Sequence, residues 1–343
     1  MVRIAQVMAG APVGGAELFY ERLCIGLHDA GETVLPVIRR HPGRAARLRE
    51  AGLQPVQLGF GSLFGLLTRG RLVGVLRRFR PDRVIGWMNR GVKSVPEGNW
   101  VLIGRLGGYY DLSHYRRCDH LVANTRGLVA WIIGQGWPAA RVHHLPNFVP
   151  DLAGAKPADR AALGVPEGAK LVLALGRLHA NKAFDVLIRA VARLPGVHAV
   201  IAGEGPQRIA LKSLARMEGV ADRVHLPGWR TDTGELLAAC DVLACPSRHE
   251  PLGNVVIEAW SAGRPVVAAA AQGPAELITT GIDGVLVAPE DPKALAEALA
   301  QVLGDSYQAA SLCAAGRGSY LADYAEAPVV ARWRSFLATA ERR

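Results

Sequence analysis

Short apolar runs alternate with longer stretches in which apolar residues recur every three or four positions. The short runs are typical of strands buried on both faces, and the longer stretches are typical of amphipathic helices. Such repetition predicts parallel sheets covered by helices on both faces. In the first half, strands are predicted over 2–8, 33–38, 83–87, 100–105, 120–124 and 141–145, with helices over 16–30 and 72–80.

The stretch from Asn147 to about Gly168 interrupts this pattern with Pro, Ala and Gly, and we interpret it as a linker. A second alternation follows, with strands predicted over 171–175, 198–202, 223–226, 241–245, 265–268 and 284–287. The chain is therefore predicted to be an α/β protein with two doubly wound, Rossmann-like domains facing a cleft. Ligands of such domains bind outside the carboxyl ends of the strands.

Composition supports a globular, intracellular protein. The chain has 343 residues, half of them apolar, which is enough for two domains with cores of their own. No apolar run is long enough to span a bilayer, and residues 1–9 resemble a first strand more than a signal peptide. The five cysteines are scattered, without a Cys-x-x-Cys pair, so we expect a reducing, cytoplasmic location.

Positive charge is concentrated in the first half of the chain. The net charge is +10, and residues 1–150 alone carry 20 Lys and Arg against 9 Asp and Glu. This imbalance predicts an anionic partner for that half. No nucleic-acid-binding module is recognisable, and the aromatics are not interleaved with the basic clusters, so nucleic acid is not expected.

The segment from Ser62 to Arg80 mixes bulky apolar residues with arginines. It has two interpretations, an interfacial helix at an anionic membrane surface or an ordinary helix that covers the sheet. The first would place the protein peripherally at the inner membrane.

The most informative motif is the block from Arg248 to Glu258, which contains Glu250 and follows a predicted strand. Gly253 or Asn254 can begin a helix there, and a helix N-terminus attracts phosphate through its unpaired N–H groups. Carboxylates on either side can accept hydrogen bonds from sugar hydroxyls. The block therefore suggests a sugar-nucleotide site, although a surface helix with a capping acid is the simpler alternative.

Two cations follow the first strand of the second domain. Arg177 comes directly after this strand and Lys182 lies near the start of the next helix, so both side chains can converge on one diphosphate. Alternatively, both are solvated surface cations. Gly203 ends a strand in a glycine turn that can form a wall of the nucleotide pocket, and Trp229 lies where a base edge can be recognised or is simply a packed aromatic.

The sequence offers no metal site and no cofactor fingerprint. It contains no Asp-x-Asp and no His, Asp or Glu cluster with metal-ligand spacing, and the usual dinucleotide motif is absent. We expect Arg177, Lys182 and the helix N-terminus at Gly253 to neutralise the leaving group in place of a metal ion.

In this order the motifs resemble those of the retaining family 4 glycosyltransferases of the GT-B fold. The resemblance is carried by Gly14, Gly15 and Glu17, by Gly176 to Lys182, by Gly203 to Pro206, by His225 to Trp229 and by Glu250 to Glu258. It covers residues 165–305 with high specificity and is weaker before them. It implies sugar transfer from a nucleoside diphosphate sugar with retention of anomeric configuration, through front-face attack assisted by the leaving phosphate.

The resemblance also implies roles for single residues. Arg177 and Lys182 would bind the diphosphate, Glu258 the ribose and Glu250 the donor sugar. Backbone amides of Leu252, Gly253 and Asn254 would approach the β-phosphate, and Gly14 and Gly15 would close on the donor from the other domain. The implied organisation is an acceptor-binding domain over 1–155, a nucleotide-sugar-binding domain over 156–325, and a C-terminal helix over 326–343 that returns to the first domain.

One departure concerns the first domain, where many members carry a His, often as His-Asp, near the sugar. The comparable stretch here runs from Arg105 to His114, and either Asp111 or His114 is a candidate for that position. A packed or surface role is the alternative for both.

The expected activity is hexose transfer to a glycan or lipid-linked acceptor, in lipopolysaccharide core or other envelope polysaccharide synthesis. Two other functions stay open, a catalytically weak GT-B protein that binds sugar nucleotides and a sugar-nucleotide 2-epimerase. Loss of Glu250, Lys182 or Arg177 would favour the weak protein, and all three are present.

Overall fold

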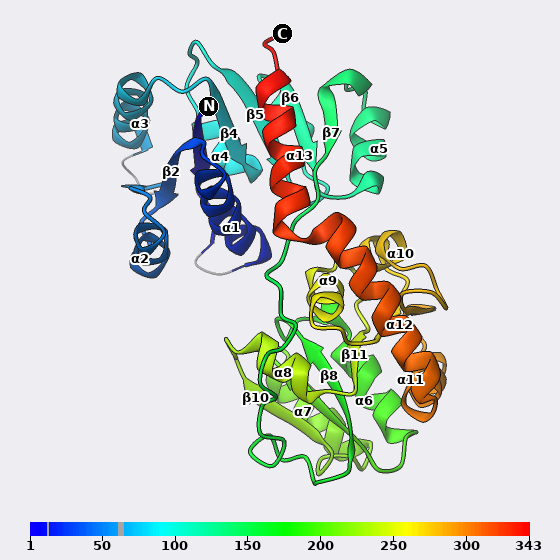
Figure 1. The fold of residues 1–343 in the computed structure, drawn as a ribbon. Coiled ribbons are helices and arrows are strands. Elements are labelled where there is room, and N and C mark those ends of the chain that lie inside the picture. The colour runs from blue at the N-terminus through cyan, green and yellow to red at the C-terminus, as the bar shows by residue number, and fades with distance from the viewer. Residues whose placement is uncertain (12–13, 61–64) are drawn as a thin grey trace. The chain divides into compact units, whose positions relative to one another are not determined.

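The computed structural model describes residues 1–11, 14–60 and 65–343 and divides the chain into two units. Unit 1 comprises Met1–Phe148 and Glu326–Arg343, and unit 2 comprises Val149–Ala325. Figure 1 shows the elements of each unit. Both are Rossmann-like: described strands pair in parallel within one sheet, and helices cover the sheet.

Unit 1 contains a seven-stranded sheet in the order β3-β2-β1-β4-β5-β6-β7. Its strands are β1 (Arg3–Met8), β2 (Thr33–Arg39), β3 (Val56–Leu58), β4 (Arg83–Trp87), β5 (Val101–Leu106), β6 (His120–Ala123) and β7 (Val142–His144). Its helices are α1 (Gly15–Asp29), α2 (Pro42–Glu50), α3 (Gly65–Phe79), α4 (Met88–Ser94), η1 (Leu112–Tyr115), α5 (Arg126–Gly134), η2 (Ala139–Arg141) and α13 (Glu326–Thr339).

Unit 2 contains a six-stranded sheet in the order β10-β9-β8-β11-β12-β13. Its strands are β8 (Lys170–Leu175), β9 (Val197–Ala202), β10 (Val224–Gly228), β11 (Val242–Cys245), β12 (Val266–Ala269) and β13 (Val285–Val287). Its helices are η3 (Ala180–Lys182), α6 (Phe184–Ala192), α7 (Arg208–Met217), α8 (Thr233–Ala239), α9 (Asn254–Ser261), α10 (Gln272–Leu277), α11 (Pro292–Gly304), α12 (Ser306–Ser319) and the π-helical turn η4 (Tyr320–Tyr324).

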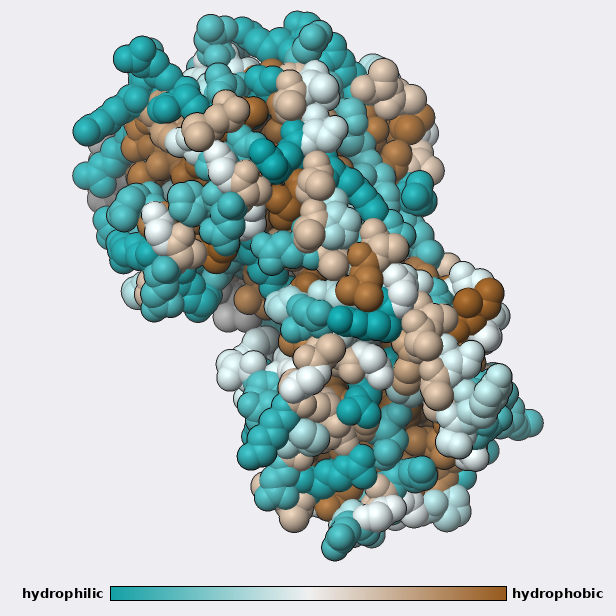
Figure 2. Space-filling view, in the orientation of Figure 1, coloured by the Kyte–Doolittle hydropathy of each residue, from teal (hydrophilic) through white to brown (hydrophobic). Residues whose placement is uncertain are grey.

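Each sheet is buried on both faces, as its nearly continuous apolar strands predict. In unit 1, Phe19 of α1 and Trp333 of α13 belong to the core on one face, and Leu72 and Leu76 of α3 belong to the core on the other. Helix α13 lies against unit 1 although the chain reaches it from unit 2 (Figure 1). The drawn face is mostly hydrophilic, with apolar residues showing between the polar ones (Figure 2).

The segment interpreted as a linker is packed rather than free. Residues 149–169 contain no described helix or strand, but Val149, Leu163 and Val165 are buried in the core of unit 2. Arg160 donates hydrogen bonds to the carbonyl oxygens of Ala239 (2.8 Å) and Ala169. This segment therefore belongs to unit 2, which begins at Val149.

The order of the strands fixes where a ligand can bind. The strands are parallel, and the direction in which successive strands are added to the sheet reverses between β1 and β4 in unit 1 and between β8 and β11 in unit 2. In open α/β sheets, the turns at the carboxyl ends of the two central strands separate at this point and leave a crevice. In unit 2 these turns are residues 176–182, after β8, and residues 246–253, after β11.

Glycines allow the strand ends of unit 2 to approach each other closely. Gly203, after β9, has a φ of 159°, and a Cβ atom there would lie 1.8 Å from the carbonyl oxygen of Gly176. A Cβ on Gly205 would lie 2.4 Å from the carbonyl oxygen of Leu178. These contacts are with backbone, which cannot move aside as a flexible side chain does. Both positions therefore require glycine.

We expect Gly203→Ala to destabilise the protein by at least about 2 kcal/mol, because the methyl group overlaps the Gly176 carbonyl group. Urea unfolding measures this loss. Gly304→Ala is the matched control, since no described residue comes within 4 Å of the place that its Cβ would occupy. That substitution should leave the free energy of unfolding unchanged or slightly raised. Equal stability of the two variants would contradict the close approach.

A histidine pair should make unit 1 sensitive to acid. Nδ1 of His120 lies 2.9 Å from Nε2 of His143, and Nε2 of His120 lies 2.9 Å from the carbonyl oxygen of Glu341. Burial and the neighbouring His120 and Arg141 lower the pKa of His143 to about 4, and burial also lowers the pKa of His120. The folded protein therefore favours the neutral pair.

The histidines of the unfolded chain take up protons near pH 6.5. The contribution of the neutral pair to the free energy of unfolding should therefore be fully present above that pH and decline as the pH falls toward about 4. Urea midpoints measured between pH 7.5 and 4.5 test this. His143→Gln should reduce the decline, whereas His249→Gln, at an exposed position, should not. The same decline in wild type and His143→Gln would contradict the assignment.

Candidate functional site

The candidate site in unit 2 is centred on an ion pair between Lys182 and Glu250. Nζ of Lys182 donates a hydrogen bond to Oε2 of Glu250, and the two side chains are only 23% and 12% exposed. The turn after β8 supplies Lys182 and the turn after β11 supplies Glu250. The pair therefore lies at the point where the strand order reverses.

The surroundings keep both charges in place. Burial by itself lowers the pKa of Lys182, but the attraction and hydrogen bond of Glu250, together with the Cys245 thiol and the Glu258 carboxylate, outweigh it and raise this pKa. Ser247 donates a hydrogen bond of 3.2 Å to Oε2 of Glu250. A partly buried cation with a fixed carboxylate beside it can bind a phosphate and a sugar hydroxyl at neighbouring points.

Helix α9 begins directly beyond Glu250. Gly253 is its N-terminal cap with a φ of 93°, in the left-handed region that favours glycine, and no side chain of the described residues caps it. Leu252 is buried, and its carbonyl oxygen would lie 2.2 Å from a Cβ on Gly273, so this turn is packed against the start of α10. The first N–H groups of α9 form a fixed, partly positive surface.

The second glutamate of the block lies in the first turns of the same helix. Glu258 is half-buried, and its charge contributes to the raised pKa of Lys182, so it lies on the same side of the site. Asn254, the first residue of α9, is also half-buried. The structure thus brings Lys182, Glu250, Glu258 and the start of α9 together.

The other predicted residues of unit 2 line the adjoining turns. Arg177 is the second residue after β8, and its side chain is exposed and makes no hydrogen bond or ion pair with another described residue. Gly203 closes the end of β9 against this turn. Trp229, just after β10, is 54% exposed. It is therefore not a packed core aromatic, which was the alternative interpretation of this residue.

In unit 1, the predicted glycines form the turn before α1. Gly14 is the N-terminal cap in extended backbone, and Gly15 begins the helix. The buried Glu17 carboxylate accepts a hydrogen bond of 2.8 Å from the amide of Ala11, and a Cβ on Gly14 would lie 2.4 Å from its Oε2 atom. Glu17 therefore holds the part of this turn that the structure describes.

Asp111 and His114 lie at η1, which follows β5. Asp111 caps this turn, accepting hydrogen bonds from the amide (2.9 Å) and hydroxyl (2.7 Å) of Ser113, and these bonds lower its pKa. Its carboxylate also lies 3.8 Å from Nε2 of His114. Asp111 is thus the N-terminal cap of η1.

Sequence reasoning gave no role to a buried cation at the end of β5. Arg105 is 1% exposed, donates a hydrogen bond to Oδ1 of Asn147, and lies over the rings of Trp87 (5.0 Å) and Phe19 (5.3 Å). Burial lowers the pKa of Arg105 to about 10. The only signal in the sequence was an arginine within an otherwise apolar strand.

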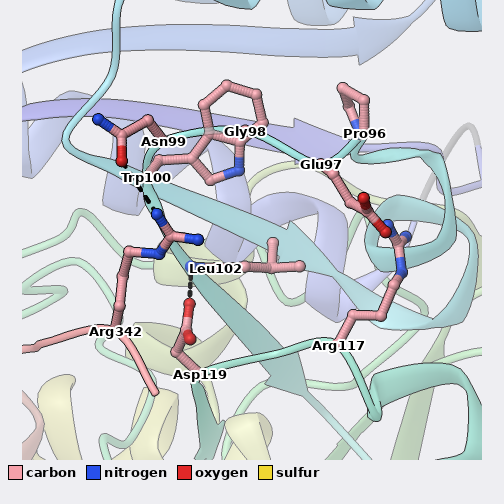
Figure 3. Close-up of a pocket in the computed structure, with 9 residues that line it drawn as sticks. All are labelled: Pro96, Glu97, Gly98, Asn99, Trp100, Leu102, Arg117, Asp119 and Arg342. Carbon is pink, nitrogen blue, oxygen red and sulfur yellow. Dashed lines mark hydrogen bonds between the residues drawn. The ribbon is translucent and has the colours of Figure 1, made fainter.

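Unit 1 has a cavity of about 340 Å³, whose lining residues are drawn in Figure 3. It lies where β5 and β6 begin, and ligands of this fold bind at the opposite edge, where strands end. It is lined by residues 96–100, just before β5, and by Asp119 and Arg342, among others. Asp119 accepts hydrogen bonds from the amides of Leu102 and Arg343, both 2.8 Å long, and Arg342 donates one to Asn99. These polar groups fasten the last residues of the chain to unit 1.

Comparison with known proteins relates the chain to sugar transferases. The family model described as glycosyl transferases group 1 matches residues 169–305, which include the site in unit 2. The lipopolysaccharide core biosynthesis glycosyltransferase LpsE of Rhizobium meliloti is 33% identical over 95% of this chain and 96% of its own length. LpsD of the same organism is 35% identical over 88% of this chain and 89% of its own length.

Solved structures share the fold. Anabaena Alr3699/HepE, solved in complex with UDP-glucose, has a TM-score of 0.85 at 21% identity, covering 99% of this chain and all of that one. WaaG, a glycosyltransferase involved in lipopolysaccharide biosynthesis, has a TM-score of 0.75 at 20% identity, with 99% of this chain and all of that one covered. Since the likeness to LpsE and LpsD extends over nearly the whole sequence, the chain belongs to the group 1 glycosyl transferases and has their GT-B fold.

Proposed function

We propose that the protein is a retaining glycosyltransferase that transfers a hexose from a nucleoside diphosphate sugar bound in unit 2. The observation that carries this proposal is the Lys182–Glu250 pair at the start of α9. It offers a cation and helix amides for the diphosphate next to a carboxylate for the sugar. HepE, which has the same fold, was solved with UDP-glucose, and this supports a sugar nucleotide as the donor.

Each part of the donor has a proposed partner. Lys182 and the exposed Arg177 neutralise the diphosphate, together with the amides of Leu252, Gly253 and Asn254. Glu258 accepts hydrogen bonds from the ribose hydroxyls. Glu250 accepts them from the donor sugar. Gly203 and Trp229 border the nucleoside, and Gly14 and Gly15 approach the donor from unit 1.

In the proposed reaction, the bond between the anomeric carbon and the β-phosphate oxygen breaks as the acceptor oxygen attacks from the same face. The acceptor proton passes to the departing phosphate oxygen, so the new bond keeps the anomeric configuration. Lys182 and the N–H groups of α9 stabilise the charge that develops on the leaving group. His114 or Asp111 is the proposed contact of unit 1 with the reacting sugar.

The acceptor we propose is a glycan or lipid-linked intermediate of lipopolysaccharide core synthesis. LpsE and LpsD, whose names place them in that synthesis, match the chain through unit 1 as well as unit 2. The excess of positive charge in residues 1–150 suits a phosphorylated or membrane-bound acceptor. We therefore propose that the protein acts in the cytoplasm, peripherally at the inner membrane.

Contact with an anionic membrane would be electrostatic. No helix of the described residues is long and apolar enough to cross a bilayer. In α3, Leu72 and Leu76 are buried against the sheet, while Arg77, Arg78 and Arg80 at its end are exposed. Residues 62–64 of the predicted interfacial segment lie outside the described residues. Leu72 and Leu76 therefore belong to the core, whereas the three arginines remain accessible to an anionic surface.

The first test removes donor contacts. Lys182→Ala and Glu258→Ala should each reduce kcat/KM for the donor about ten- to a hundredfold, because each loses a charge-assisted contact of about 1.5 to 3 kcal/mol. Lys212→Ala and Glu297→Ala, at exposed positions, are the matched controls. Unchanged donor kinetics in both site variants would refute the assignment.

The second test concerns divalent metal. Lys182, Arg177 and the start of α9 supply positive charge at the proposed diphosphate site, so transfer should continue at the same rate in excess EDTA. Initial rates with and without EDTA, magnesium and manganese measure this. Complete loss in EDTA that magnesium or manganese restores would show that a metal ion supplies the charge.

The third test is liposome flotation. The protein should float with anionic vesicles but not with zwitterionic ones, and salt should weaken the binding because surface attraction decays over about 8 to 10 Å. Combined Arg77, Arg78 and Arg80 to Glu substitutions should abolish it. Combined Lys212, Arg216 and Lys293 to Glu substitutions in unit 2 change the net charge equally and should not. Equal flotation with both lipids, or none at low salt, would exclude the membrane contact.

A further inference from the structure

Arg248 is the centre of a network that no proposed donor contact explains. Its Nη1 and Nη2 atoms donate hydrogen bonds to the two carboxylate oxygens of Asp185, at 2.8 and 2.7 Å. Nη2 also donates one of 2.9 Å to Glu290. Hydrogen bonds to Asp185 first, and then to Glu290, raise the pKa of Arg248. One guanidinium group thus joins the start of α6 to the segment before α11.

The same residue joins the two turns that carry the Lys182–Glu250 pair. Nη1 of Arg248 donates a hydrogen bond of 2.8 Å to the carbonyl oxygen of Ala180. The backbone amides of Arg248 and His249 both donate to the carbonyl oxygen of Asn181, at 2.9 and 3.2 Å. Besides the Lys182–Glu250 bond, three hydrogen bonds among the described residues therefore connect the turn after β8 to the turn after β11.

Both segments that Arg248 holds contain strained backbone. Ala183, which follows Lys182, has a φ of 52°, and Glu290 has a φ of 63°. A non-glycine residue in the left-handed region costs about 1 to 3 kcal/mol and persists where its surroundings determine it. Such outliers concentrate at functional sites. Contacts of Arg248 restrain both segments.

We propose that Arg248 is a positioning residue, anchored by Asp185, that sets the approach of Lys182 to Glu250. The Arg248 side chain holds the carbonyl group of Ala180, two residues before Lys182, next to the backbone hydrogen bonds at Asn181. These contacts restrain the two turns from which Lys182 and Glu250 extend toward each other. Holding a flexible lysine in its bound geometry removes part of the entropy cost of binding a diphosphate. The ligand part of this proposal rests on the proposed function, whereas the geometry does not.

Lysine labelling tests the geometry without a ligand. The chain has six lysines, and their acetylation rates can be followed one by one by mass spectrometry of the folded protein. In Arg248→Gln, Lys182 should be acetylated at least about twofold faster, because the loss of one coupled contact loosens its ion pair. Lys212 and Lys170, exposed in the same unit, should be unaffected.

Arg317→Gln is the matched control for this substitution. Arg317 also forms a two-bond pair with a carboxylate, that of Asp151 (2.7 Å each), and donates a hydrogen bond to a backbone carbonyl group in unit 2. Its loss should not change the Lys182 rate. An unchanged rate in Arg248→Gln, or an equal rise in Arg317→Gln, would overturn the positioning role.

A double-mutant cycle tests the consequence for binding. UDP, GDP and ADP are titrated calorimetrically into wild type, Arg248→Gln, Lys182→Ala and the double variant. Both single substitutions should raise the Kd of the nucleotide that wild type binds. The Kd of the double variant should lie within about twofold of that of Lys182→Ala, because Arg248 acts through Lys182. If the loss of affinity in the double variant equals the product of the two single losses, Arg248 does not act through Lys182, and the positioning role is overturned. If wild type binds none of the three, the proposed donor site fails, and the labelling result still decides the geometry.

Discussion

The pairing of Lys182 with Glu250 is the interaction on which the site of unit 2 depends. Withdrawing two charges from water is costly, and removing one partner leaves the other uncompensated. The pair is tolerable because Ser247 and the turn after β8 hold both groups in one geometry. The turn after β8 can pack against the end of β9 because Gly203 and Gly205 have no Cβ atom to clash with the backbone of Gly176 and Leu178. The position of the ion pair therefore depends on both the strand order and these two glycines.

This arrangement separates two tasks within unit 2. The parallel sheet, buried on both faces, supplies a rigid edge, and the turns on that edge carry the polar groups. A site built on such turns is accurate only if they are restrained. Arg248 joins the two turns, and Gly273 packs the turn before α9 against α10. Lys182 and Glu250 thus supply the charges of the site, while Arg248 and Gly273 restrain the turns that carry them.

Much of the fold could be predicted from the sequence, because the strands are short apolar runs and the helices are stretches in which apolar residues recur every three or four positions. Twelve strands were predicted close to their observed ends. The three-residue β3 was not, since Val56–Leu58 is too short to give a pattern. The packing of residues 149–169 also escaped prediction, because their few apolar residues, such as Leu163, follow no period.

The site could be predicted only in part. Glu250, Lys182 and Gly253 follow strands that meet at one edge of a sheet, and this relation can be inferred from chain order alone. The partners of Arg248 cannot, because Asp185 and Glu290 are 63 and 42 residues away in the chain and carry no motif. The sequence also did not indicate that the carboxylate of Asp111 caps η1. The roles of the predicted donor residues stay predictions.

The central claim is that unit 2 binds a nucleoside diphosphate at the Lys182–Glu250 pair. The most direct measurement is the thermal unfolding of the whole chain with UDP, GDP and ADP, and with their sugar derivatives. A ligand selective for the folded state adds about 2.7 kcal/mol of stability at a hundred times its Kd. We predict a raised Tm with at least one nucleotide, and a smaller shift in Lys182→Ala. No shift with any nucleotide at millimolar concentration would contradict the account.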